Sequence, residues 1–251
     1  MPRAERRKSE SGVYHVMLRG INRQQIFYDE EDNAYFIQLL KRIKETSSFE
    51  LYAYCLMGNH VHLLLKVGKD PIETIFRRLG AAFVYWYNIK YARVGHLFQD
   101  RFKSEPVDDD RYFLTVLRYI LQNPVKAGLC RTPENYPYSS VREYLKGSDG
   151  VTDTAFAFSI CGAAQLAEFI RQKNDDRCME NDDTPAVRLT DADAARAIVK
   201  EFGTLTPDVG TTKDRSTLNT SIRQILKAGV SIRQLSRLTG LSKKIIESSK
   251  K

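Results

Sequence analysis

The segment from Phe49 to Val67, FELYAYCLMGNHVHLLLKV, constrains the fold of this chain most strongly. Its two apolar runs meet at Gly58-Asn59, a dipeptide that turns strands, so the segment predicts a β-hairpin. Alternate residues of a strand share one face and lie about 7 Å apart. His60 and His62 are therefore expected side by side on one face of the second strand. The opposite face would point into a core through Val61, Leu63, Leu65 and Val67.

Two neighbouring imidazoles can hold one metal ion, although a solvated or hydrogen-bonded histidine is the simpler interpretation for either residue alone. Zinc hydrolases with such pairs also need a third protein ligand. None follows His62, and the remaining histidines are His15 and His96. We interpret these two as structural or DNA-facing and leave them out of the metal site. The pair thus indicates a metal site that must be completed from elsewhere in the chain.

Apolar periodicity predicts a definite order of elements around the hairpin. A strand over 13–18 and a helix over 29–47 precede it, and a helix over about 71–91 and a strand over 102–107 follow it. A further helix over 110–123 begins at a run of three aspartates, 108–110, and is expected to end at Asn123-Pro124. This order is typical of the split βαβ, ferredoxin-like arrangement. We therefore predict an α+β fold, an antiparallel sheet with helices on one face.

Composition divides the chain into three expected parts. Residues 1–147 form the ferredoxin-like domain, 148–189 a helical extension with an acidic linker, and 190–251 a small all-α domain. In the last part, two serine-capped helices around a glycine turn favour a helix-turn-helix whose recognition helix opens with Lys243-Lys244. The alternative is a plain helical appendage whose basic residues are merely solvated.

The balance of charge favours a polyanionic partner. The net charge is +8, and residues 215–251 alone hold nine Lys or Arg against one Glu. No apolar run reaches the length of a membrane helix, and the N-terminal residues lack a signal-peptide pattern. Four scattered cysteines fit a reducing compartment. These features predict a cytoplasmic protein that has no membrane partner.

A nucleophile for phosphodiester cleavage can be sought on the helix over 110–123. Tyr119 and Asn123 are four residues apart and share a helix face. Attack by a tyrosine preserves the phosphodiester energy in a phosphotyrosine, whereas attack by water loses it. The amide oxygen of Asn123 could act as a third, neutral metal ligand. Spacing alone does not select Tyr119 over Tyr112.

Three segments then resemble a known family. GNHVHLLL, GHLFQDRFKS and RYILQNPVKAGL, at 58–65, 95–104 and 118–129, are similar to the signature blocks of REP-associated tyrosine transposases. These proteins are the domesticated branch of the single-tyrosine HUH transposases. YHVMLRGINRQQIF and YPYSSVREYLKG, at 14–27 and 136–147, match further parts of the same pattern. The resemblance covers roughly residues 1–170 in the order that the family shows.

The resemblance implies a ferredoxin-like HUH nuclease that nicks and rejoins single-stranded DNA beside a hairpin through a 5′-phosphotyrosine. His60 and His62 match the ligands of a divalent metal, Mg²⁺ or Mn²⁺, while Tyr119 matches the nucleophile and Asn123 the polar ligand. The expected partners are single-stranded and hairpin DNA, with no small-molecule substrate, in a nucleoid-associated monomer or homodimer. The residues that we expect to contact DNA are Arg3, Arg19, Asn22, Arg23, Gln99, Arg101, Lys103, Lys243 and Lys244.

Two other hypotheses remain open at this point. A catalytically idle regulator could recognise hairpin repeats with the same fold, but it would have no need of both histidines, Tyr119 and Asn123 together. An RNA-directed nuclease or phosphodiesterase is more distant. A covalent adduct with labelled DNA would separate the transposase hypothesis from both.

Overall fold

The computed structural model describes residues 6–99, 101–147, 149–173, 175–179, 191–206, 215–230 and 232–249. The chain divides into two compact units, Met1–Met179 and Glu180–Lys251, and each is described here by itself. Residues 149–179, expected as an extension and the start of a linker, pack within the first unit through α5 (Ala155–Ile160) and α6 (Ala163–Arg171).

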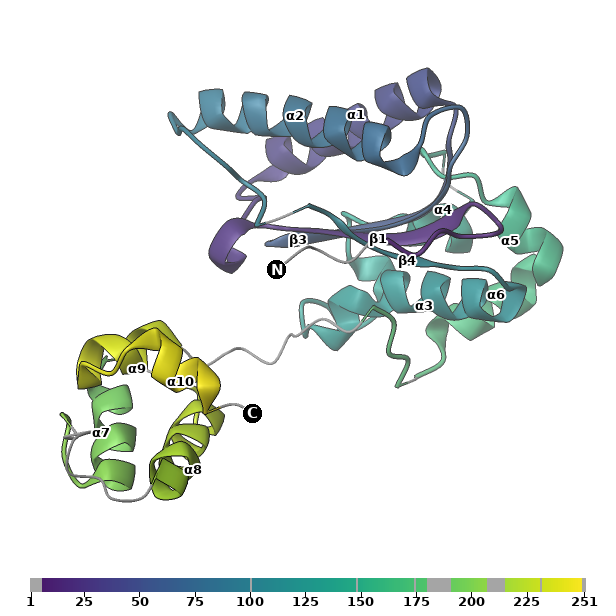
Figure 1. Ribbon diagram of the computed structural model, residues 1–251. Helices are drawn as coiled ribbons and strands as arrows, with labels where there is room; N and C mark the ends of the chain where they lie inside the picture. The colour runs from purple at the N-terminus through teal and green to yellow at the C-terminus, as the bar shows by residue number, and fades with distance from the viewer. Residues whose placement is uncertain are drawn as a thin grey trace. The chain divides into compact units, whose positions relative to one another are not determined.

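A four-stranded antiparallel sheet forms the centre of the first unit (Figure 1). Its strand order is β2-β3-β1-β4, and each neighbouring pair is antiparallel. This order confirms the ferredoxin-like prediction. The strand bounds are β1 Val13–Arg19, β2 Glu50–Met57, β3 His60–Lys66 and β4 Lys103–Pro106, so β4 is shorter than the expected 102–107.

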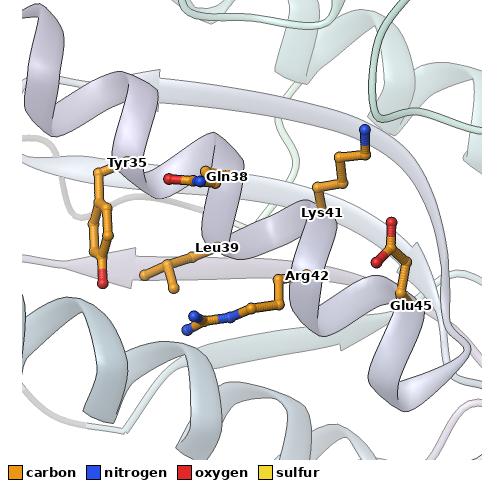
Figure 2. Close-up of a pocket in the computed structure, with 6 residues that line it drawn as sticks. All are labelled: Tyr35, Gln38, Leu39, Lys41, Arg42 and Glu45. Carbon is orange, nitrogen blue, oxygen red and sulfur yellow. The ribbon is translucent and has the colours of Figure 1, made fainter.

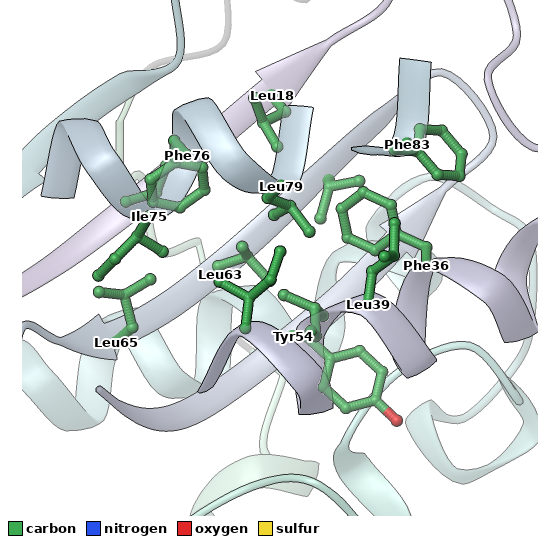
Figure 3. Close-up of a cluster of buried hydrophobic side chains, with 14 of the residues drawn as sticks. Leu18, Phe36, Leu39, Tyr54, Leu63, Leu65, Ile75, Phe76, Leu79 and Phe83 are labelled. Atoms are coloured by element: carbon green, nitrogen blue, oxygen red, sulfur yellow. The ribbon is translucent and has the colours of Figure 1, made fainter. Parts of the chain in front are cut away.

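Helices α1 (Glu30–Ser47) and α2 (Ile72–Lys90) cover one face of this sheet (Figure 1). Asp29 caps α1 through a capping box with Asp32, which satisfies backbone donors at the helix start. The core beneath these helices is apolar and contains the side chains that β3 was expected to bury. Figure 3 shows part of it, including Leu18, Phe36, Leu39, Leu63, Leu65, Ile75, Leu79 and Phe83.

A second layer of helices packs on the opposite face of the sheet (Figure 1). Helix α3 (Asp110–Lys126) is its main element, and α4 (Val141–Leu145), α5 and α6 lie with it. The sheet is therefore buried on both faces, and not covered by helices on one face as expected, which accounts for the near-continuous apolar sequence of β2 and β3. The two histidines of β3 face this second layer.

Helix α3 continues past the point where the sequence predicted its end. Asn123-Pro124 was expected to stop the helix, but α3 runs on to Lys126 with Pro124 inside it. Pro124 lacks a backbone N–H and so removes one helical hydrogen bond, but tertiary contacts such as that of Gln122 hold the helix on both sides of it. The backbone N–H of Ala127 still donates to the carbonyl of Asn123 at 2.9 Å, and that of Leu129 to Pro124 at 2.9 Å. The extra turn adds Lys126 to the helix.

The second unit is a small helical domain with an apolar core of its own. Its helices are α7 Asp191–Phe202, α8 Arg215–Lys227, α9 Ile232–Thr239 and α10 Lys243–Ser248. A turn through Gly240, whose φ of 76° suits glycine, joins α9 to α10. The Ser242 hydroxyl caps α10 by accepting from the Ile245 N–H at 3.3 Å. The other expected serine cap, Ser231, lies outside the described residues.

Candidate active site

His60 and His62 lie next to each other on β3, on the face that α3 covers. Their ring centroids are 5.0 Å apart with an interplanar angle of 86°. His60 is 8% exposed and His62 is fully buried. They face α3 because the intervening Val61 and the following Leu63 belong to the core under α1 and α2. The alternation read from the sequence is confirmed.

Hydrogen bonds fix the Nδ1 atom of each imidazole. His60 Nδ1 lies 2.6 Å from the Asn59 side-chain oxygen, and His62 Nδ1 lies 2.9 Å from His15 Nε2. The Asn59 amide group in turn donates to the Arg23 carbonyl at 3.2 Å, which sets the direction of its oxygen. His62 Nε2 is buried and has no hydrogen-bond partner among the described residues. Such an orphaned ring nitrogen is the kind of atom that a metal ion satisfies.

The environment of His62 favours the uncharged imidazole. Burial, followed by the neighbouring His60, His15 and Arg19, holds the pKa of His62 well below its usual 6.5. A neutral imidazole is the form that binds metals, since a protonated ring has no lone pair to offer.

Tyr119 on α3 packs directly against the histidines. Its ring centroid is 5.7 Å from that of His62 and 5.8 Å from that of His15, with edge-to-face geometry in both cases. The Lys126 ammonium lies over the Tyr119 ring, 5.2 Å from its centroid. Asn123 follows one turn along the same helix, and both residues are 8% exposed. Tyr119 and the two histidines therefore lie together on the α3 side of the sheet.

The side chains near the two histidines offer no acidic, cysteine or further histidine ligand for a metal ion among the described residues. Within the described ranges, no three His, Cys, Asp or Glu side chains converge to hold a metal ion. His15 is close, but one of its ring nitrogens contacts His62 and the other contacts Glu105 at 2.8 Å. A neutral amide such as that of Asn123 is thus the remaining type of protein ligand on this face.

Tyr112 differs from Tyr119 in its surroundings. Burial, and after it the charge of Glu105, raises the pKa of Tyr112 well above its usual value. The Tyr112 phenol is therefore held in its protonated form, which is the weaker nucleophile. The surroundings of Tyr112 could not be obtained from its spacing to Tyr119.

The C-terminal half of α3 is anchored by contacts with α6 and with the segment that follows α6. Arg118 makes a bidentate ion pair with Asp176, at 2.7 and 3.0 Å, and stacks on Phe169. The Gln122 amide donates to the carbonyl of Gln172 at 2.9 Å and to that of Ile170. Because α3 carries Tyr119 between these anchors, the tyrosine is positioned by a rigid element.

The expected DNA-contacting residues of the first unit fall in two places. Arg19 lies opposite His60 in the sheet register, and the Gln99 backbone N–H donates to its carbonyl at 2.8 Å. Asn22 and Arg23 form the short 3₁₀ turn η1 (Ile21–Arg23), where both have positive φ angles of 52° and 58°. The structure thus brings four of these residues to the His60 end of the sheet.

The remaining expected contacts lie apart from that end. Arg101 and Lys103 are exposed near β4, where Lys103 is opposite Met17 of β1. Lys243 and Lys244 are exposed on α10 of the second unit. Arg3 lies outside the described residues.

Sequence reasoning missed three residues of this site. His15 was left out of it, Glu105 was not considered, and Lys126 was placed beyond the end of its helix. The available signal was alternation along β1, because His15 shares a face with Met17 and Arg19. The pairing of β1 with both β3 and β4 brings His15 between His62 and Glu105, and that register is not readable from one strand.

A hollow on α1 lies away from the histidines (Figure 2). It lies on the α1 side of the sheet, whereas the histidines face α3. Its lining combines no nucleophile with a ligand pair, so it offers no comparable chemistry. The residues around it are Tyr35, Gln38, Leu39, Lys41, Arg42 and Glu45.

Across the described ranges, the helices lack the length and apolarity that a membrane span requires.

Comparisons with known proteins find similar sequences among transposases. Residues 8–123 match the family described as "Transposase IS200 like". A Haemophilus influenzae protein assigned to the REP-associated tyrosine transposases is 27% identical over 150 residues, which is 55% of this chain and 84% of the relative. The Escherichia coli REP-associated tyrosine transposase is 24% identical over 109 residues, covering 42% of this chain and 63% of the relative.

A solved structure supports the fold. It is described as a REP-associated tyrosine transposase bound to a REP hairpin, and it aligns with 61% of this chain and 94% of its own. The TM-score is 0.51 at 20% sequence identity. The matched family model spans all four strands, both histidines, Tyr119 and Asn123. Residues 8–123 of this chain are thus similar to the IS200-like transposases.

Proposed function

We propose that this protein is a transposase, a metal-dependent single-stranded DNA endonuclease and strand transferase that acts beside DNA hairpins through a covalent 5′-phosphotyrosine at Tyr119. One observation carries the proposal. The Tyr119 ring contacts the ring of His62, so the phenol and the two-histidine pair are available to the same phosphate. A catalytically idle binder would gain nothing from this arrangement.

The residues present fit a divalent metal ion. His62 Nε2 is a buried nitrogen without a hydrogen-bond partner among the described residues, and Asn59 directs the lone pair of His60 to the corresponding Nε2. The Asn123 amide oxygen would supply the third protein ligand. Two neutral nitrogens and one neutral oxygen would leave positions for water and phosphate oxygens, the hard ligands that Mg²⁺ and Mn²⁺ prefer. When bound, such an ion acts as a Lewis acid on the scissile phosphate.

The chain's own residues then perform the transfer. The Tyr119 phenolic oxygen attacks phosphorus, a P–O bond to Tyr119 forms, and the P–O bond to the 3′ oxygen breaks. The 3′ oxygen leaves and takes up a proton. Rejoining reverses these steps: a DNA 3′ hydroxyl attacks the phosphotyrosine and Tyr119 recovers its proton. The number of phosphodiester bonds is thereby conserved without an external energy source.

Cations around Tyr119 assist this chemistry. Lys126 lies over the Tyr119 ring, and its charge favours the phenolate as the proton leaves. Arg19, opposite His60 in the sheet, is placed to neutralise a phosphate at the other side of the ligand pair. Arg23, Arg101 and Lys103 would hold the DNA strand through its phosphates, while Asn22 and Gln99 contact bases.

The proposed DNA partner is a hairpin with a single-stranded flank. The solved relative is described in complex with a REP hairpin, and the basic residues listed above suit a phosphate backbone. The second unit would add a duplex contact through Lys243 and Lys244 on α10, beyond the matched family region. For the oligomeric state, the prediction remains a monomer or a homodimer.

The proposal is tested by incubating the full-length protein with 5′- and 3′-labelled hairpin DNA that carries single-stranded flanks. With Mn²⁺ or Mg²⁺ we expect a site-specific nick and a protein-linked 5′ end on denaturing gels. Chelator should abolish the nick and preserve binding. Tight hairpin binding without any nick in either metal would favour the idle regulator instead.

A further inference from the structure

A row of three side chains crosses the sheet beneath the candidate metal site. Glu105 on β4 contacts His15 Nδ1 at 2.8 Å, and His15 Nε2 contacts His62 Nδ1 at 2.9 Å. His15 and His62 are fully buried, while the Glu105 side chain is 24% exposed. The row belongs to three different strands, so the sheet register itself sets these distances.

The order of donors and acceptors in this row follows from its carboxylate. An ionised carboxylate only accepts, so His15 Nδ1 must carry a proton and donate to Glu105. A singly protonated His15 then has its lone pair on Nε2, which accepts from a proton on His62 Nδ1. The lone pair of His62 is consequently on Nε2, the buried atom without a hydrogen-bond partner among the described residues.

The reverse order is unfavourable at both ends of the row. It would set a lone pair of His15 Nδ1 against a Glu105 oxygen. It would also leave an N–H on His62 Nε2, where the described residues offer no acceptor. Glu105 is itself oriented, because its second oxygen accepts from the backbone N–H of Met179 at 3.1 Å. The carboxylate therefore imposes one direction on the whole row.

We propose that His15 and Glu105 are positioning residues that hold His62 as the Nδ1–H tautomer, with its Nε2 lone pair directed to a divalent cation. This inference rests on the proposed function, since it assigns the row to the same metal site. Ligating histidines commonly donate their second N–H to a carboxylate or carbonyl. Loss of such a partner typically lowers metal affinity by about 10–100-fold. Here a second histidine transmits the effect of the carboxylate.

The same logic applies to the other histidine by a different route. Asn59 Oδ1 accepts from His60 Nδ1 at 2.6 Å and thereby also leaves the lone pair of His60 on Nε2. The turn residue Asn59 is in effect the local counterpart of the His15–Glu105 pair. The two histidines are thus preset in one tautomer by independent partners.

The test uses full-length protein labelled with ¹⁵N-histidine and free of metal. The chain has only four histidines, so long-range ¹H–¹⁵N spectra can be assigned by single substitutions. For His62 we expect one tautomer, with the proton on Nδ1. A proton on Nε2 of His62 in the wild-type protein would overturn the inference without any variant.

Two variants extend the test to metal binding, measured by titration with Mn²⁺ alone. His15→Phe keeps a ring and removes both hydrogen bonds, and Glu105→Leu removes the carboxylate at a less buried position. Each should give mixed tautomers at His62 and raise the Mn²⁺ dissociation constant, by about 10–100-fold for His15→Phe. His96→Phe, at an exposed loop position, should match wild type in both measurements.

The outcomes separate this inference from the proposed function. If His62 keeps the Nδ1–H tautomer and wild-type Mn²⁺ affinity in the folded Glu105→Leu protein, the row is structural and the inference fails. If the tautomer and the affinity respond as expected but no DNA adduct forms in wild type, the proposed function fails alone. If His15→Phe does not fold, the wild-type spectrum and Glu105→Leu still decide.

Discussion

Removal of the two lysines that open α10 tests whether the second unit contacts duplex DNA. Lys243 and Lys244 are exposed and follow the Ser242 cap, while the buried Ile246 anchors the helix. The nearby Arg237 is already paired with Asp191 at 2.6 and 2.7 Å. Lys243→Ala/Lys244→Ala should therefore remove two phosphate contacts and leave the fold of the unit intact.

The size of the effect follows from counterion release. Each phosphate contact contributes roughly 0.9 to the slope of log affinity against log salt on duplex DNA, so the slope should decrease by about 1.8. Between about 50 and about 200 mM salt, wild type should lose roughly 12-fold more affinity than the double variant does. The assay is fluorescence anisotropy of a labelled hairpin across that salt range.

A matched control removes two positive charges from the first unit, on the face of its sheet opposite to the histidines. Lys41 and Arg42 are exposed on α1, whereas the histidines face α3 on the opposite side of the sheet. Lys41→Ala/Arg42→Ala should leave the slope near the wild-type value. An unchanged slope in the α10 variant, or an equal change in the α1 control, would refute a specific DNA contact by the second unit.

Two further predictions concern the first unit. His60→Ala or His62→Ala should abolish nicking in Mn²⁺ and preserve most hairpin affinity, because phosphate contacts elsewhere survive. Gel-shift and nicking assays on one preparation measure both properties. Full nicking activity of the double variant in chelator would contradict this prediction. Asp109→Ala should lower the free energy of unfolding by about 0.5–2 kcal/mol, because the Asp109 carboxylate accepts from the Tyr112 N–H at 2.8 Å and caps α3. Urea denaturation measures this change. An unchanged midpoint of the urea transition would mean that the cap contributes nothing.

Much of this fold could be predicted from apolar periodicity. The hairpin at Gly58-Asn59, the face of β3 that carries the histidines, and the apolar stripes of α1 and α2 all follow from local patterns. The end of α3 could not be predicted, because Pro124 is tolerated in a last turn whose helix is anchored by tertiary contacts. Local sequence describes the preference of a segment, and packing can override it.

The candidate site was predictable only where its residues lie close in sequence. His60 with His62, and Tyr119 with Asn123, are each within one turn or two strand positions. The Glu105–His15–His62 row joins residues 90 and 47 positions apart, so it depends on strand order and register. Single-strand alternation places His15 on a face but does not say which side chain lies opposite it.

The identity of the tyrosine that becomes linked to DNA tests the central claim most directly. Labelled hairpin DNA is incubated with Mn²⁺ and the wild-type protein, and the protein-linked 5′ end is digested and mapped by mass spectrometry. The account predicts a 5′-phosphotyrosine at Tyr119. Tyr119→Phe, which loses only the phenolic oxygen, should bind the hairpin and give no adduct, whereas Tyr112→Phe should retain most of it. An adduct at Tyr112, or a persistent adduct in Tyr119→Phe, would contradict the account.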